Sequence, residues 1–302
     1  MNERISNFRQ VANISRYVLS GGKESGLEVL DCNNGKIRFL LNVSRALDIM
    51  QLYHYGENIS FISKNGFINQ ETPFINRFEG GMVYTCGLDN MGRREGFVQH
   101  GTFHVTPALV TRAECDENGI LVEALISDTA LFGKNLAVKR KIFTPIGAEY
   151  VTLEDTLINQ GCRDEEYCVL YHVNLGYPLL QEGSKIESDV KKILPTSSWA
   201  EQNVNTALTI EEPVKNQEET CYYLDLKKPQ ISLVNDKYGK KFTLSYSADT
   251  LPCFLEWKSM ASGDYALGLE PCTSFVGKDI EPKTVKAGSS VKFSLKFQIE
   301  KI

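Results

Sequence analysis

The sequence predicts an all-β protein, built as a sandwich or a barrel of many short strands. Three observations lead to this prediction. Apolar and polar residues alternate over many short segments, turn residues separate those segments at close spacing, and helical periodicity is scarce. The lack of helices between strands argues against a parallel sheet of βαβ units. No internal repeat and no long Pro-, Ser- or Gly-rich linker divides the chain, so we expect residues 1–302 to form one domain.

The predicted strands follow from period-two patterns. The clearest pattern lies at the C-terminus, where polar residues alternate with Val291, Phe293, Leu295, Phe297 and Ile299. Further strands are expected over residues 37–43, 121–126, 151–157, 221–226 and 242–246, although Asp155 interrupts the apolar face of the third. Tight reversals are predicted at Asn33-Asn34-Gly35, Asn65-Gly66, Glu117-Asn118-Gly119 and Ala287-Gly288.

Two segments depart from the strand pattern. Residues 3–18 predict one short amphipathic helix, with a stripe formed by Ile5, Phe8, Ala12 and Ser15. Residues 181–220 are polar and weakly periodic, so we expect long loops over one face of the protein.

Composition excludes several classes of protein. With 42% hydrophobic and 24% charged residues, the chain does not resemble a disordered, collagen-like or coiled-coil protein. The net charge is −5 and no basic run exceeds three residues, which argues against a nucleic-acid partner. No apolar stretch approaches 18 residues, and the N-terminus lacks a signal-peptide core. We therefore expect a soluble cytoplasmic protein with a small polar ligand, no membrane partner and reduced cysteines.

Two segments in the first half of the chain carry residues that are unusual for strands. Arg77 precedes the pair Gly80-Gly81, which permits a close backbone approach, so it is either a ligand-binding residue or an exposed arginine beside a turn. His100 and His104 share a strand face but lack further metal ligands, so we expect no metal site. We interpret His100 as a hydrogen-bonding residue of a cleft and His104 as a structural residue.

Two segments in the second half suggest acid–base chemistry. In a strand, His172 and Asn174 point to the same face, as part of either a core network or a site. Glu270 lies in an apolar run framed by Gly268 and Pro271. Burial in such a run raises the pKa of a carboxyl group toward the value that a general base needs near neutral pH. The alternative interpretation of Glu270 is a structural residue in an ion pair. Trp257 is either a core residue or a platform for a sugar ring.

The same segments carry a resemblance to a known family. They are Ser44-Arg45-Ala46-Leu47-Asp48-Ile49, Phe78-Glu79-Gly80-Gly81, Thr85-Cys86-Gly87-Leu88-Asp89-Asn90, His100-Gly101, Tyr171-His172-Val173-Asn174-Leu175-Gly176 and Gly268-Leu269-Glu270-Pro271. In this order they resemble the galactose mutarotase-like superfamily, and within it a branch of aldose 1-epimerase-like proteins that form a domain-of-unknown-function family. Ala46 stands where that branch usually has glycine.

The resemblance implies a large twisted antiparallel β-sandwich that interconverts the anomers of a free or phosphorylated monosaccharide. By position, Glu270 corresponds to the base that removes the proton of the C1 hydroxyl, and His172 to the acid that protonates the ring oxygen. Arg77, His100, Asn174 and Trp257 are expected to bind the substrate, and no cofactor is expected. The family also has an acidic residue between the histidine and the glutamate, for which Glu211, Glu212 and Asp225 are candidates.

Three functions remain open at this point: a sugar isomerase, a sugar sensor of the same fold without catalysis, and a carbohydrate lyase or hydrolase. The presence of both His172 and Glu270 favours the isomerase, because a protein that only binds needs no acid–base pair. A homo-oligomer is compatible with the sequence, which identifies neither the sugar nor the subunit number.

Overall fold

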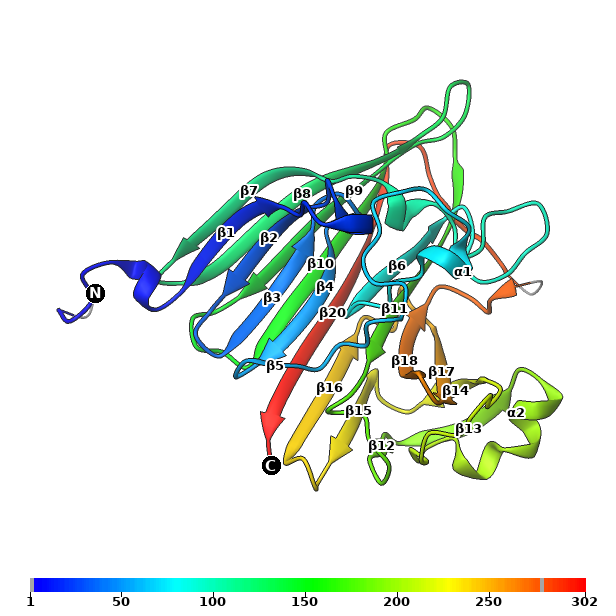
Figure 1. Ribbon diagram of the computed structural model, residues 1–302. Coiled ribbons are helices and arrows are strands. Elements are labelled where there is room, and N and C mark those ends of the chain that lie inside the picture. Colours follow the sequence, from blue (N-terminus) through cyan, green and yellow to red (C-terminus); the bar gives the residue numbers. More distant parts are fainter. Residues whose placement is uncertain (1–2, 278–279) are drawn as a thin grey trace.

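The computed structural model describes residues 3–277 and 280–302, and its strands form three antiparallel sheets (Figure 1). The small sheet contains, in spatial order, β1 (Asn13–Val18), β2 (Glu28–Asn33), β3 (Ile37–Asn42), β4 (Asp48–His54) and β5 (Glu57–Asn58). The large sheet contains β12 (Lys185–Glu187), β15 (Gln230–Asn235), β16 (Lys240–Tyr246), β20 (Ser290–Lys301), β10 (Tyr150–Asn159), β9 (Asn135–Thr144), β8 (Gly119–Thr129) and β7 (Leu109–Asp116).

The third sheet positions the candidate site, and we call it the site sheet. It contains β13 (Val190–Pro195), β14 (Thr220–Leu226), β17 (Cys253–Ala261), β18 (Asp264–Cys272), β11 (Glu165–Leu175) and β19 (Lys283–Val285), and β6 (Val83–Leu88) pairs with β11. Short helices connect the strands: η1 (Phe8–Gln10), η2 (Gly22–Glu24), α1 (Phe74–Arg77), η3 (Phe103–Val105), α2 (Ser198–Gln202) and η4 (Val204–Thr206).

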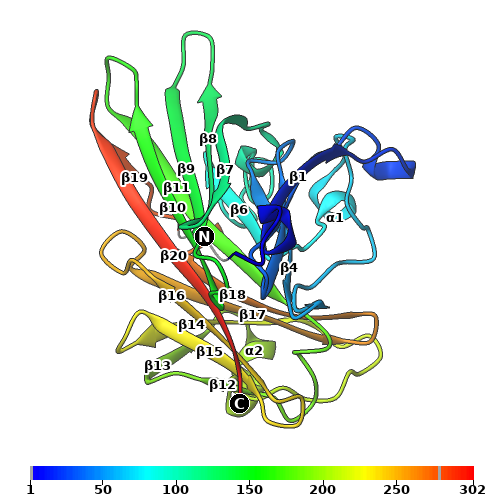
Figure 2. The same cartoon turned by 90° about the vertical axis from the view of Figure 1, so that its left-hand side faces the viewer.

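One apolar core joins the three sheets. It combines residues of the small sheet such as Phe39, of the large sheet such as Phe297, and of the site sheet such as Tyr171. Figure 2 shows the small sheet facing the large sheet, so that the alternating apolar faces of both are covered. The predicted antiparallel β-sandwich is therefore confirmed, and each of the predicted strands lies within or overlaps an observed one. The longest described helix, α2, has five residues, so no described helix has the length or apolar character to span a bilayer.

The predicted N-terminal helix is wrong for most of its length. Only η1 is helical, as a three-residue 3₁₀ turn, and residues 13–18 form β1, which pairs with β2. Pairing along an existing strand outweighs a weak helical pattern, since propensity is a small term beside tertiary contacts. Residues 181–220 likewise contain β12, β13, α2 and η4 as well as loops.

Candidate active site

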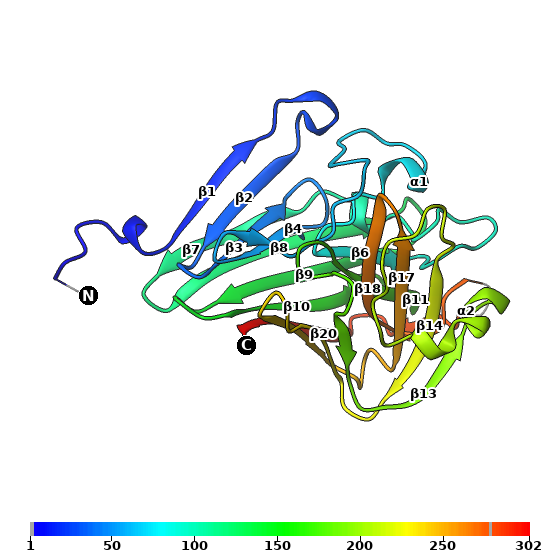
Figure 3. The same ribbon diagram turned by 60° about the horizontal axis from the view of Figure 1, so that its bottom comes forward.

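A cavity of about 830 Å³ lies between the site sheet and the segments 61–78 and 92–100. Figure 3 shows α1, from the first of these segments, beside β17 and β18. Cavities of this size accommodate small organic ligands. Aromatic rings form part of the wall, namely Phe61, Phe74, Phe78 and Trp257, and the polar lining includes Lys64, Arg93, His100, His172, Glu219, Asp264 and Glu270.

His172 and Glu270 both line this cavity and are in contact with each other. They stand opposite each other on β11 and β18, between the register pairs Leu170–Cys272 and Val173–Leu269. Nε2 of His172 lies 3.1 Å from Oε1 of Glu270, and the two residues are only 5% and 1% exposed. The structure therefore brings together the two residues that the sequence suggested as an acid–base pair.

Gly268 makes room for this contact. A Cβ atom at this position would overlap Oε1 of Glu270 and would lie 3.1 Å from Cε1 of His172. The glycine of the Gly-Leu-Glu-Pro motif thus serves the glutamate two residues later, because any larger side chain would occupy the place of its carboxyl group.

Burial shifts the two pKa values in opposite directions. It raises the pKa of Glu270 well above its usual value, and the charge of Glu219 adds to this effect. It lowers the pKa of His172 well below its usual value, and His100 adds to that shift. Both shifts favour the uncharged forms, namely a carboxylic acid at Glu270 and a neutral imidazole at His172.

His100 also lines the cavity, with its ring 5.9 Å from that of His172. Its backbone is left-handed, with φ of 62°, and its Nδ1 accepts a hydrogen bond of 3.3 Å from the backbone N–H of Gly92. Burial and the neighbouring Arg77 lower the pKa of His100 to about 4. Neutral His100 therefore keeps its proton on Nε2, which makes this atom a hydrogen-bond donor at neutral pH.

Arg77 was expected to bind the substrate, but it does not line the cavity. Its Nη2 donates a hydrogen bond of 3.5 Å to the carbonyl oxygen of Gly101. The two glycines that follow it behave as predicted: Gly80 and Gly81 have φ of 77° and 79°, and a Cβ at Gly80 would clash with the backbone of Phe61. After burial, the positive charge of Arg77 is the second cause of the lowered pKa of His100 in the cavity wall.

Asn174 is likewise absent from the cavity wall and is fully buried. Its Nδ2 donates to the carbonyl oxygens of Gly81 and His172, at 3.0 and 2.9 Å. The expectation that Asn174 binds substrate does not fit this position. Its side chain shares a strand face with His172, but it is bonded to backbone carbonyl groups and has no exposed surface.

Trp257 lines the cavity and is held by an acidic residue that the sequence did not reveal. Its Nε1 donates a hydrogen bond of 2.7 Å to Oε2 of Glu219, and its ring centroid is 5.3 Å from that of His172. Glu219 is exposed, lines the cavity and lies between His172 and Glu270 in the chain. It had no motif signal, because it precedes β14 in a polar segment.

The acidic candidates from the sequence lie elsewhere. Glu211 accepts a hydrogen bond of 3.0 Å from Lys258, and Asp225 is paired with Lys191 at 3.3 Å. Neither lines the cavity, and the same holds for Glu212. Among residues 3–277 and 280–302, no group of three His, Cys, Asp or Glu side chains could hold a metal ion.

A buried ionic network supports the site from the other side of β6 and β11. Asp48 accepts hydrogen bonds from His104 at 2.6 Å and from Thr85, and is paired with Arg140. Arg140 in turn donates two hydrogen bonds to Asp155, at 2.9 and 2.7 Å. The aspartate that interrupts the apolar pattern of β10 is therefore a structural partner of a fully buried arginine.

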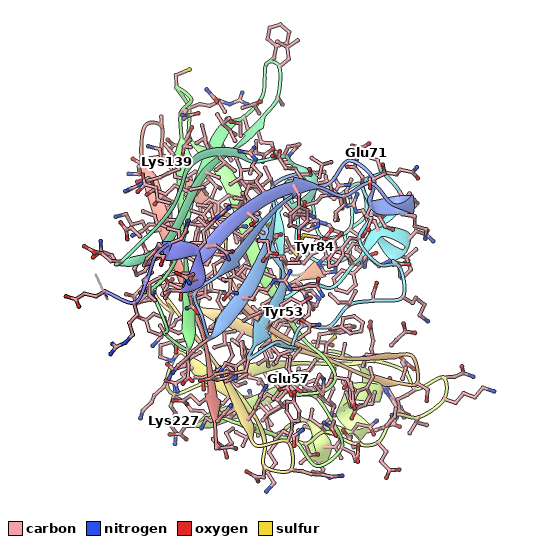
Figure 4. The ribbon with its side chains drawn as sticks, turned by 60° about the vertical axis from the view of Figure 1, so that its left-hand side comes forward. Tyr53, Glu57, Glu71, Tyr84, Lys139 and Lys227 are labelled. Atoms are coloured by element: carbon pink, nitrogen blue, oxygen red, sulfur yellow. The ribbon has the colours of Figure 1, made fainter. Side chains whose placement is uncertain are left out.

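Tyr84 connects this network to the aromatic wall of the cavity. Its ring stacks on that of His104 at a centroid distance of 3.7 Å and contacts Phe78 and Phe74 on its other side. Tyr84 also pairs with His172 across β6 and β11. Figure 4 shows Tyr84 inside the molecule, whereas Glu71, Lys139 and Lys227 lie at its periphery. His104 is thus structural, as interpreted from the sequence.

Comparison with known proteins places nearly the whole chain in one fold. A family model described as Domain of unknown function (DUF4432) matches residues 24–299. A solved protein from Klebsiella pneumoniae, provisionally assigned as an aldose 1-epimerase, superposes with a TM-score of 0.88 at 22% identity, covering 97% of this chain and 86% of that one. None of the curated proteins matches the sequence.

Two more distant structures share the fold. A galactose mutarotase-like protein from Clostridium acetobutylicum has a TM-score of 0.72 at 14% identity, covering 97% of this chain and 100% of that one. A galactose mutarotase related enzyme from Lactobacillus acidophilus has a TM-score of 0.65 at 11% identity, covering 90% and 97%. At these identities the likeness establishes the mutarotase-like sandwich and leaves activity to the residues of the site.

Proposed function

The chain belongs to the family described as Domain of unknown function (DUF4432), and from that premise we propose that it is an aldose 1-epimerase-like isomerase. Its substrate is a monosaccharide, free or phosphorylated, whose anomers it interconverts through ring opening. The observation that carries this proposal is the contact of His172 and Glu270, 3.1 Å apart in a cavity of about 830 Å³.

Anomer interconversion needs two proton transfers at neighbouring oxygens. The proton of the C1 hydroxyl is removed while the ring oxygen gains one, and the same two groups reverse roles when the ring recloses on the other face. The reaction is neutral overall and transfers no electrons. A pair of titratable side chains in contact within a sugar-sized cavity meets these requirements.

The resting pair holds one proton, which resides on Glu270 because of the pKa shifts described above. Its transfer to Nε2 of His172 across the 3.1 Å contact creates a carboxylate and an imidazolium. Glu270 is then the base for the C1 hydroxyl and His172 the acid for the ring oxygen. A bound sugar favours this charged form, because its hydroxyl groups solvate charges that the empty, partly apolar site does not.

The surrounding residues suit a sugar ring. The Trp257 indole offers an apolar surface for the C–H face of a pyranose, while Glu219 and the Nε2–H of His100 offer an acceptor and a donor for hydroxyl groups. Glu219 takes the place of the acidic residue that the family resemblance led us to expect between His172 and Glu270.

Polarimetry and saturation-exchange NMR at the anomeric proton test the proposal directly. A panel of free and phosphorylated aldoses is mixed with the wild-type protein, with Glu270→Gln and with His172→Asn. We expect the wild type to accelerate anomer exchange, Glu270→Gln to abolish this acceleration without loss of folding, and His172→Asn to lower kcat more than it raises KM.

A sugar sensor of the same fold gives a different result. It binds one or more of these sugars saturably, in calorimetry or ligand-observed NMR, without accelerating exchange of any. That outcome would replace the isomerase by the binding function.

A further inference from the structure

Among the described residues, two buried polar atoms on neighbouring side chains of β11 lack a hydrogen-bond partner. One is Nδ1 of His172, the ring nitrogen that does not face Glu270, and the other is Oδ1 of Asn174. Both residues are at least 95% buried, so water does not readily satisfy either atom. Leaving such groups unpaired costs on the order of 1–3 kcal/mol each.

The two atoms belong to adjacent side chains. Asn174 follows His172 by two residues on β11, and its amide lies against the histidine, because Nδ2 donates to the His172 carbonyl oxygen at 2.9 Å. With both amide hydrogens used, on His172 and Gly81, Oδ1 is left as an acceptor with no donor. The only group that Nδ1 of a histidine can offer such an acceptor is N–H.

We infer that Asn174 is a positioning residue, whose Oδ1 accepts the Nδ1–H of His172 and thereby fixes the histidine in the tautomer with an unprotonated Nε2. Neither atom has another hydrogen-bond partner among the described residues, so both are available for this bond. Its consequence rests on the proposed function: Nε2 then has the free lone pair that it needs to take the proton of Glu270. The opposite tautomer would already carry hydrogen on Nε2 and could not accept it.

The electrostatics agree with this arrangement. Burial and His100 lower the pKa of His172, whereas the Asn174 side chain acts in the opposite direction. An acceptor on the ring N–H has this effect, because it stabilises the imidazolium more than the neutral ring. A histidine that must become an acid during the reaction benefits from such a partner.

Nitrogen NMR of the full-length protein, with nitrogen-15 in its histidine rings, tests the inference without reference to activity. The chain has four histidines, so comparison with His172→Asn assigns the signals of His172. We expect Nδ1 to give a signal of the protonated, pyrrole-like type and Nε2 one of the unprotonated, pyridine-like type. The reverse pattern in the wild-type protein would overturn the inference.

Two variants connect the tautomer to Asn174. Asn174→Leu removes the acceptor at similar volume and is expected to give a mixture of His172 tautomers. We expect kcat to fall about 10–100-fold with KM little changed. This range is the one known for residues that orient metal-binding histidines. Asn42→Leu replaces another fully buried asparagine, on β3, and is expected to leave the His172 signals as in the wild type. A single unchanged tautomer in Asn174→Leu would show that Asn174 does not set it.

The NMR and kinetic results separate the two proposals. If the wild type shows the expected tautomer but accelerates no anomer exchange, the positioning role stands and the isomerase proposal fails. If exchange is accelerated while Nδ1 is unprotonated, the isomerase stands and the role of Asn174 fails.

Discussion

The indole Nε1 of Trp257 donates a hydrogen bond of 2.7 Å to Oε2 of Glu219, so the apolar platform and the acidic residue of the cavity hold each other in place. Substitution of either residue should therefore weaken sugar binding more than chemistry. We expect Glu219→Gln and Trp257→Phe to raise KM by about 10-fold and to change kcat less. The reason is that one lost hydrogen bond or ring contact is worth roughly 1 kcal/mol or slightly more. Anomer-exchange rates over a range of sugar concentrations measure this. Glu218→Gln, which removes the same charge one residue earlier, is the control and should leave KM unaltered.

The space at Gly268 leads to a second prediction. Gly268→Ala places a methyl group where the carboxyl group of Glu270 lies, so the carboxyl must move away from His172. A displacement of this kind is expected to lower kcat by about 100-fold while the protein stays folded. Gly21→Ala is a suitable control, because its Cβ would meet only the end of Glu24 at 3.7 Å. Wild-type kcat in Gly268→Ala would show that the contact of Glu270 with His172 is not needed.

The opposed pKa shifts of the pair predict the pH dependence of catalysis. The pair must hold one proton, so activity falls at low pH when His172 gains a second proton and at high pH when Glu270 loses its own. Since the pKa of His172 is lowered and that of Glu270 is raised, kcat/KM should stay flat across neutral pH. Exchange rates from pH 5 to 9, corrected for spontaneous mutarotation at each pH, measure this profile. A step close to pH 6.5 would indicate a histidine with an ordinary pKa.

Glu256, on the opposite face of β17 from Trp257, predicts a pH dependence of stability. Burial raises its pKa to about 8, with Lys258 opposing and Glu211 adding to the shift. Because the folded-state pKa exceeds the unfolded value, folding favours the protonated form, and the stabilisation is complete below about pH 4.5 and lost as pH rises toward 8. The full shift corresponds to a loss on the order of 5 kcal/mol.

Glu256→Gln should remove this loss, since the amide cannot ionise. Urea unfolding at pH 6 and pH 9 should show a smaller decrease in the free energy of unfolding for the variant than for the wild type. Glu212→Gln, at an exposed position, should keep the wild-type decrease. Equal decreases in all three proteins would mean that Glu256 does not titrate in this range.

The buried network predicts a large mutational effect far from the cavity. Asp155→Ala leaves Arg140 in the core without the two hydrogen bonds that Asp155 accepts from it, and leaves the hydroxyl of Tyr171 without its 2.7 Å acceptor. Loss of one partner of a buried ion pair costs about 3–5 kcal/mol. Asp225→Ala, which breaks the exposed pair with Lys191, should cost less than about 1 kcal/mol. Denaturant unfolding distinguishes these two effects.

Glu270 and His172, which the sequence singled out, lie together in the cavity lining, and there is a physical reason why they stood out. Burying a carboxyl or imidazole group within an apolar strand costs free energy unless the group is paired. Its presence in such a strand therefore indicates either a structural partner or a functional site. Glu219 lacks such a signal, because an acidic residue in a polar segment looks like any exposed charge. Arg77 and Asn174 show the converse: their type and spacing suggested binding, yet neither lines the cavity, and both donate to backbone carbonyl groups instead.

The all-β class, most strands and the choice of His172 and Glu270 as acid–base candidates follow from the sequence, because the alternation of polar and apolar residues and the cost of buried charge act locally along the chain. Only the tertiary structure decided that Glu270 faces His172 at 3.1 Å, that Glu219 holds Trp257, and that Arg140 joins Asp48 to Asp155. These relationships depend on strand register. Except for Arg140 and Asp155, they also join residues that are more than 30 positions apart in the chain. Such contacts form only when the three sheets pack around one core.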